Sequence, residues 1–219
     1  MTTHATPAAG WRKMVVQALL GGLVGAGGMF AAMSLLRGDG GLDWQPSQIV
    51  LVGVGMIYLL MGIFVGLGAL APRLFGARML NVADAEEIVE ERTGMGGSAA
   101  SSAAIGLVLM LLAYVTVDGA RGPVTPAAAF WILLAMLVAT TAASLWMWRS
   151  FDELWRRLTV EAGALTANLL LALLIVWGAA AATGLVAGPH PLDLVSAAFG
   201  SLLLATFIAA GRRGMMQPR

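Results

Sequence analysis

Long apolar runs alternate with short polar connections along this chain of 219 residues. Six windows are apolar almost throughout, and only the fifth contains a charged residue, Glu161 near its start. They cover residues 14–36, 49–71, 98–117, 127–148, 158–186 and 194–210. About 20 apolar residues are enough for a helix to cross the hydrocarbon core of a bilayer. Lipid offers the backbone no hydrogen bonds, so these windows are predicted to be helices. The pattern predicts an all-α, polytopic integral membrane protein, with residues 1–219 forming one six-helix transmembrane domain.

The basic residues are distributed unevenly over the predicted connections. With six spans, eleven of the thirteen Lys and Arg residues fall on one side, and only Arg37 and Arg121 fall on the other. Short cytoplasmic loops carry an excess of Lys and Arg, so the larger group marks the inner side. Both termini are therefore expected in the cytoplasm.

Composition narrows the class of protein further. Hydrophobic residues make up 59% and charged residues 11%, whereas a typical soluble domain has about 25% charged residues. A net charge of +1 without a basic stripe gives no reason to expect nucleic-acid binding. The chain has no cysteine, which excludes disulfides and thiolate ligands. Arginine is strongly preferred over the single lysine, Lys13, and glycine is abundant. This usage is typical of a GC-rich bacterial genome, and the expected location is the bacterial inner membrane.

The first window can be interpreted as a retained helix or as a cleaved signal peptide. Arg12 and Lys13 would form the basic start of a signal peptide. The apolar stretch of residues 14–36 exceeds the usual 7–15 residues of such a peptide, which favours a retained helix. Removing it would leave the orientation of the other five spans unchanged, so the charge distribution does not distinguish the two.

A charged knot, RSFDELWRRLTVEA at residues 149–162, separates the fourth and fifth windows. Glu153, Arg157 and Glu161 are four residues apart and share one helical face, so Arg157 is expected to bond both acids as a structural clasp. A continuous helix that crosses the water boundary would account for these charges. The octet WRRLTVEA at residues 155–162 also echoes WRKMVVQA at residues 11–18, through duplication or through a shared way of starting an inward-anchored helix.

Part of this knot resembles known sequences. FDELWRRLTVEA at residues 151–162 resembles a pattern in uncharacterised small bacterial multi-span proteins. In that pattern, Asp-Glu is followed by arginine and then by Glu-Ala, and the segment leads into a transmembrane helix. The resemblance covers about a dozen residues, and it implies a membrane protein with no assigned activity.

The connection between the second and third windows, NVADAEEIVEERTG, predicts a short acidic cytoplasmic helix at residues 82–93. Asp84 suits the N-cap, Glu87 completes a capping box, and Gly94 suits the position after the helix end. Asp84, Glu87 and Glu91 are predicted to share a face. That face is expected to be solvated and is a candidate for docking a partner; binding of a divalent cation through oxygen is the alternative.

Small residues recur at four-residue spacing in the first two windows. Gly21 and Gly25 form such a pair in the first, and Gly62 and Gly66 form one in the second. In lipid, this spacing lets helix backbones approach closely. Packing within the chain is the simplest interpretation, and an oligomer interface or a pore-lining span is the alternative. Asn168 is expected to hydrogen bond across helices.

No catalytic, metal or cofactor motif stands out. His190 lies in the outer loop GPHP, where Asp193 suits the start of the sixth helix better than a metal site. No charged residue or histidine lies near a predicted mid-membrane position, which disfavours ion-coupled transport. The sequence therefore favours a non-catalytic accessory or scaffold subunit that binds another membrane protein or a second copy of itself. A small transporter or channel for a neutral or lipid-like substrate is the alternative.

Overall fold

The computed structural model describes residues 43–70, 92–120, 122–149 and 153–213. Within these ranges the chain forms five helices: α2 (Pro46–Leu70), α5 (Arg92–Val115), α6 (Pro126–Met147), α7 (Glu153–Ala182) and α8 (Pro191–Arg212). Each is long and apolar enough to cross a membrane. The predicted all-helical membrane class is confirmed for five of the six windows, and window 14–36 lies outside the described residues.

Local sequence signals explain where α6 and α8 begin. The Oγ1 atom of Thr125 accepts a hydrogen bond from the backbone N–H of Ala128 at 3.2 Å, and Pro126 opens α6. At α8, the Nδ1 atom of His190 accepts from the N–H of Leu192 at 3.3 Å, and the His190 N–H donates to Asp193 Oδ2 at 2.7 Å. These caps satisfy backbone N–H groups that have no partner within the helix. The expected place of Asp193 in the first turn of this helix is confirmed.

Helix α7 ends four residues earlier than the predicted window. Gly184 adopts a positive φ of 75°, its N–H donates to the Ala181 carbonyl at 3.0 Å, and the Leu185 N–H donates to the Ala180 carbonyl at 2.9 Å. This pair of bonds is the Schellman arrangement that closes helices at a left-handed residue, usually glycine. The window continues to residue 186 in the sequence because Leu185 and Val186 are as apolar as the helix before them.

Helix α5 starts earlier than predicted, and this corrects one expectation. The sequence pattern places Arg92 and Thr93 at the end of the acidic helix and Gly94 just beyond it, but these three residues form the first turn of α5. Glycine and serine in the segment GMGGSAASSA do not interrupt the helix, because small residues are common in transmembrane helices where backbones approach closely. Residues 82–91 lie outside the described part of the chain.

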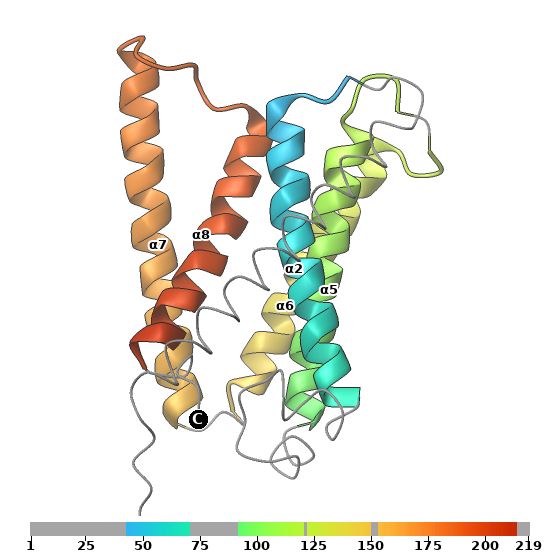
Figure 1. The fold of residues 1–219 in the computed structure, drawn as a ribbon, viewed down its shortest axis with the longest axis vertical. Coiled ribbons are helices and arrows are strands. Elements are labelled where there is room, and N and C mark those ends of the chain that lie inside the picture. Colours follow the sequence, from blue (N-terminus) through green and yellow to red (C-terminus); the bar gives the residue numbers. More distant parts are fainter. Residues whose placement is uncertain (1–42, 71–91, 121, 150–152, 214–219) are drawn as a thin grey trace, which may run out of the picture.

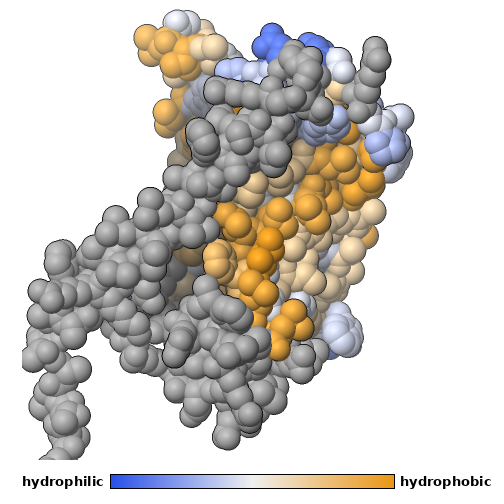
Figure 2. Space-filling model, turned by 45° about the vertical axis from the view of Figure 1, so that its right-hand side comes forward, coloured by the Kyte–Doolittle hydropathy of each residue, from blue (hydrophilic) through white to orange (hydrophobic). Residues whose placement is uncertain are grey.

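In chain order the five helices run alternately down and up (Figure 1). They pack as neighbours in the order α6, α5, α2, α8 and α7, so the adjacent α2 and α8 run in the same direction. The contact between α2 and α5 is the most extensive, and α7 packs mainly on α8. Figure 2 shows one face of the molecule, on which the described surface is mostly hydrophobic along the helices, with hydrophilic patches toward the top and bottom of the view. Lipid would therefore meet an apolar belt, as expected for a membrane-spanning bundle.

Glycine and alanine bring α2 and α5 together. A Cβ atom added at Gly62 would lie 2.6 Å from the Ala103 nitrogen and 2.7 Å from the Ala99 carbonyl oxygen. A Cβ atom added at Gly106 of α5 would lie 2.5 Å from the carbonyl oxygen of Gly55. Any larger side chain would push the backbones apart, so the close approach depends on glycine at these positions. The simplest interpretation of Gly62, packing within the chain, agrees with this contact.

Helix α8 attaches to α2 through Tyr58. The Tyr58 hydroxyl donates a hydrogen bond to the backbone carbonyl of Phe199 at 3.0 Å, and the two rings meet edge to face with centroids 6.0 Å apart. Both residues adjoin the apolar cluster built around the fully buried Leu51 and Leu109. This contact joins α7 and α8 to the α2–α5 core.

A small polar cluster joins α2 to the end of α5. The buried amide of Gln48 donates to the Thr116 carbonyl at 2.8 Å and accepts from the Gln45 N–H at 2.9 Å. Nearby, Asp43 and Asp118 pair through an isolated antiparallel bridge. These bonds satisfy backbone groups outside the helices and fix the relative height of α2 and α5.

Candidate functional site

Residues 153–162 of the charged knot lie on helix α7, which is longer than a membrane requires. At about 1.5 Å per residue, its thirty residues reach about 45 Å, whereas the hydrocarbon core is about 30 Å thick. About ten residues therefore extend beyond the hydrocarbon. The charged residues occupy the first nine positions of the helix, Glu153–Glu161, and this accounts for their place in so apolar a chain.

The expected clasp is formed only in part. Arg157 Nε lies 2.6 Å from Glu153 Oε1, and both side chains are about 70% exposed. Glu161 does not pair with Arg157. Its Oε2 atom accepts from Arg213 Nε at 3.1 Å and Nη2 at 2.8 Å, while Arg212 Nη1 lies 3.4 Å from Oε1. The expectation that Arg157 bonds both acids is therefore wrong for Glu161.

The pairing of Glu161 follows from the packing of α7 on α8. Glu161 precedes Ala162, which is buried with Leu158 against Ala209 of α8. This contact brings the start of α7 beside the end of α8, where Arg213 follows the last helical residue. The side chains of Glu161 and Arg213 are only 28% and 24% exposed, so this pair is better shielded than the pair on the helix surface.

An open cavity of about 420 Å³ lies at this end of α7 and α8. Its lining combines three arginines and two glutamates with the apolar side chains of Val160 and Ala164; the charged members are Glu153, Arg156, Arg157, Glu161 and Arg213. Arg156 Nε donates to the Trp148 carbonyl at 3.3 Å, which directs its guanidinium back toward the end of α6. The cavity therefore has a positively charged rim above a hydrocarbon wall.

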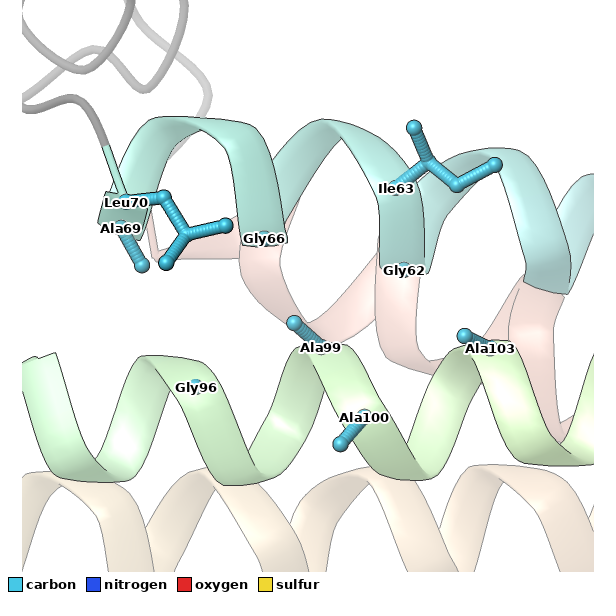
Figure 3. Close-up of a pocket in the computed structure, with 9 residues that line it drawn as sticks. All are labelled: Gly62, Ile63, Gly66, Ala69, Leu70, Gly96, Ala99, Ala100 and Ala103. Atoms are coloured by element: carbon cyan, nitrogen blue, oxygen red, sulfur yellow. The ribbon is translucent and has the colours of Figure 1, made fainter.

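A second cavity, of about 350 Å³, lies between α2 and α5 near Leu70 (Figure 3). Its walls are small and apolar, and they include Gly62, Gly66, Ala99 and Ala103. Figure 3 shows Ala99 and Ala103 pointing toward α2, while Ile63 points away from α5. A Cβ atom added at Gly66 would find Ala99 Cβ at 3.6 Å, an ordinary contact distance, because the helices diverge toward this end. The cavity offers packing space and no charged group.

Several polar side chains within the helices bond to the backbone of their own helix. Thr140 bonds the Met136 carbonyl at 2.8 Å, Thr166 bonds that of Ala162 at 2.7 Å, and Thr206 bonds that of Leu202 at 2.8 Å. The Asn168 amide also donates within its helix, to the Ala164 carbonyl at 2.9 Å. The expected bond from Asn168 to another helix is therefore not the one observed. In the described residues, each of these side chains therefore bonds within a single helix.

Several predicted site residues lie outside the described part of the chain. They are Asp84, Glu87 and Glu91 of the acidic face, together with Gly21 and Gly25. Among the described residues, no group of three or more His, Asp or Glu side chains is placed to hold a metal ion.

Sequence reasoning did not assign Arg156, Arg212 and Arg213 to a site. Arg212 and Arg213 are adjacent just after the sixth window, where the charge pattern indicates only a topology signal. Their role depends on which helix lies beside α8, and an apolar helix without a polar face gives little information about its neighbours.

In comparisons with known proteins, no protein-family model, curated protein or solved structure matched the chain.

Proposed function

We propose that the protein is a non-catalytic subunit of a membrane assembly and binds another membrane protein through its outer helices. The observation that carries this proposal is a small-residue face on α6 that no other described helix covers. Ala135, Ala139 and Ala143 are four residues apart, and all three are exposed among the described residues. This is the spacing that allows close helix–helix approach in lipid.

The position of α6 supports the same proposal. It lies at one end of the row of helices and packs mainly on α5, and Ala129 is its only buried residue in the described structure. Among the described helices, α7 lies at the other end of the row, and its buried residues there are Leu158 and Ala162. Both outer helices therefore present most of their surface outward, where lipid or a partner helix can cover it.

We also propose that the end carrying the arginines faces the cytoplasm of a bacterial cell. In the described residues, Arg149, Arg156, Arg157, Arg212 and Arg213 lie at one end of the helices, where α6 stops and α7 starts. The connections at the other end carry Asp43, Asp118 and Asp193. Basic residues accumulate in cytoplasmic loops, which supports an inner-membrane protein with both termini inside.

Copurification with matched variants tests the subunit proposal. The protein would be extracted in mild detergent, and its associated proteins would be quantified by mass spectrometry. Ala139→Leu adds bulk to the small-residue face, whereas Val138→Leu adds one methylene to a neighbouring exposed position. We expect a stoichiometric partner that Ala139→Leu removes and Val138→Leu retains.

Other outcomes would contradict the subunit proposal. Self-association without another protein would favour a homo-oligomer and leave the transporter or channel alternative standing. A partner retained equally by both variants would show that binding does not use the α6 face. The mass of the detergent-solubilised complex distinguishes these cases.

A further inference from the structure

We propose that the cavity between the start of α7 and the end of α8 binds the phosphate headgroup of an anionic phospholipid. Arg156, Arg157 and Arg213 line the cavity, and Arg157 offers the most open donors. Arg156 also bonds the carbonyls of Trp148 and Arg149, and Arg213 bonds Glu161. Guanidinium donors match phosphate oxygens in geometry and charge. Basic pockets between transmembrane helices are suited to anionic headgroups.

The two glutamates hold two of the arginines in place and cancel only part of the positive charge. Glu153 bonds Arg157 and Glu161 bonds Arg213, which leaves one unbalanced positive charge among the five charged lining residues. Arg149 and Arg212, at the same end of the helices, add two more. Arg157 uses Nε for Glu153, and its terminal nitrogens make no further hydrogen bond in the described structure. They are therefore available to an anion.

The shape of the cavity favours a lipid over a free phosphate. From Glu153 to Ala164 the helix rises about 16 Å, at about 1.5 Å per residue. The lining changes over this distance from charged side chains to Val160 and Ala164, and Val160 is 59% exposed. A phospholipid has the same order of groups, with its phosphate at the interface and its acyl chains below. A soluble phosphate would leave the apolar wall uncovered.

Native mass spectrometry of the full-length protein in detergent would test the site. Dioleoylphosphatidylglycerol and dioleoylphosphatidylcholine have the same acyl chains, and only the first carries a net negative charge. We expect the anionic lipid to bind at a lower concentration than the zwitterionic one. Arg157→Gln should weaken binding of the anionic lipid about tenfold, since a direct hydrogen bond to a charged group contributes about 1.5 kcal/mol.

Two further variants separate a built site from general charge attraction. Arg149→Gln removes the same charge at the same end of the molecule but lies outside the cavity lining, so its effect should remain below about twofold. The double variant Glu153→Gln and Arg157→Gln keeps the net charge but removes the guanidinium, and it should weaken binding as Arg157→Gln does. Helical content and thermal unfolding without added lipid confirm that each variant is folded.

Three results would overturn the proposal. Equal binding of the two lipids would show that the charge of the headgroup does not contribute to binding. Equal weakening by Arg149→Gln and Arg157→Gln would indicate diffuse electrostatic attraction. Competition by millimolar glycerol 3-phosphate would assign the cavity to a soluble phosphate, because that molecule shares the headgroup chemistry and lacks acyl chains.

Discussion

Glu161 of α7 and Arg213 beyond α8 are 52 positions apart in the chain, and the guanidinium donates two hydrogen bonds, of 3.1 and 2.8 Å, to one carboxylate oxygen. The pair ties the start of one membrane helix to the end of the next. Arg212 approaches the other oxygen of Glu161 at 3.4 Å. A carboxylate near the edge of the hydrocarbon is thus held by two cations from another helix.

This pairing reverses the expected order of two substitutions. The sequence predicts that Glu161→Gln is tolerated, because Gln17 occupies the matching place in the first octet, and that Arg157→Ala is more harmful. In the structure, Glu161→Gln should lower the free energy of unfolding by roughly 1.5 kcal/mol, typical of hydrogen bonds to charged groups. Arg157→Ala should cost about 0.5 kcal/mol, as for exposed helical pairs. Thermal unfolding in detergent would measure both, and a larger effect of Arg157→Ala would contradict the assignment.

Two glycines four residues apart in α2 should respond oppositely to alanine. Gly62→Ala places its Cβ within 2.7 Å of backbone atoms of α5, and overpacking of this kind costs about 1–3 kcal/mol. Gly66→Ala places its Cβ 3.6 Å from the Cβ of Ala99, and alanine favours the helix by up to about 1 kcal/mol. Unfolding of both variants under one set of conditions provides the comparison. Similar losses at the two positions would show that α2 and α5 do not cross as described.

Two buried polar side chains near the end of the bundle opposite the arginines should also differ. Gln48 bonds both Gln45 and Thr116, so Gln48→Met removes two hydrogen bonds and should cost about 1–3 kcal/mol. The buried Ser196 hydroxyl has no hydrogen-bond partner in the described structure, so Ser196→Ala should be neutral or stabilising. The measurement is the midpoint of thermal unfolding. A destabilising Ser196→Ala would reveal a partner for this hydroxyl.

Reporter fusions would test the proposed orientation. A cytoplasmic reporter should be active after Arg149 and after Arg213, and a periplasmic reporter should be active at Gly122 and Gly188. The reason is that the described arginines gather at the end that contains Arg149 and Arg213. A periplasmic signal after Arg213 would exclude the proposed topology.

The sequence predicts the helices well because lipid imposes a simple length and polarity rule on each span. It predicts their ends less well where packing decides. Helix α5 continues back through Gly96 and Gly97 to Arg92, although glycine normally interrupts helices in soluble proteins. The end of α7 can be predicted from the sequence, because glycine is the usual residue at the left-handed position after a helix and Gly184 occupies it.

Neighbours are harder to predict than spans. Glu161 has a basic residue one turn away on its own helix, and local spacing alone favours Arg157. Its observed partner depends on α7 packing on α8, which places Ala162 against Ala209. Helices that are apolar on all sides carry no polar face to indicate which side is turned toward another helix. The small residues Gly62 and Gly106 indicate close contacts between helices, but the sequence does not identify which helix packs against each of them.

The bond between Tyr58 and Phe199 also constrains the order of assembly, because the two residues are 141 positions apart. A ribosome adds about 5–20 residues per second, so the acceptor emerges roughly 7–28 s after the donor. During that interval α2 can already pair with α5, while its Tyr58 hydroxyl has yet to meet α8. The last described helix therefore completes a contact in the interior of the first described helix, and a chain terminated before α8 would insert without the partner of Tyr58.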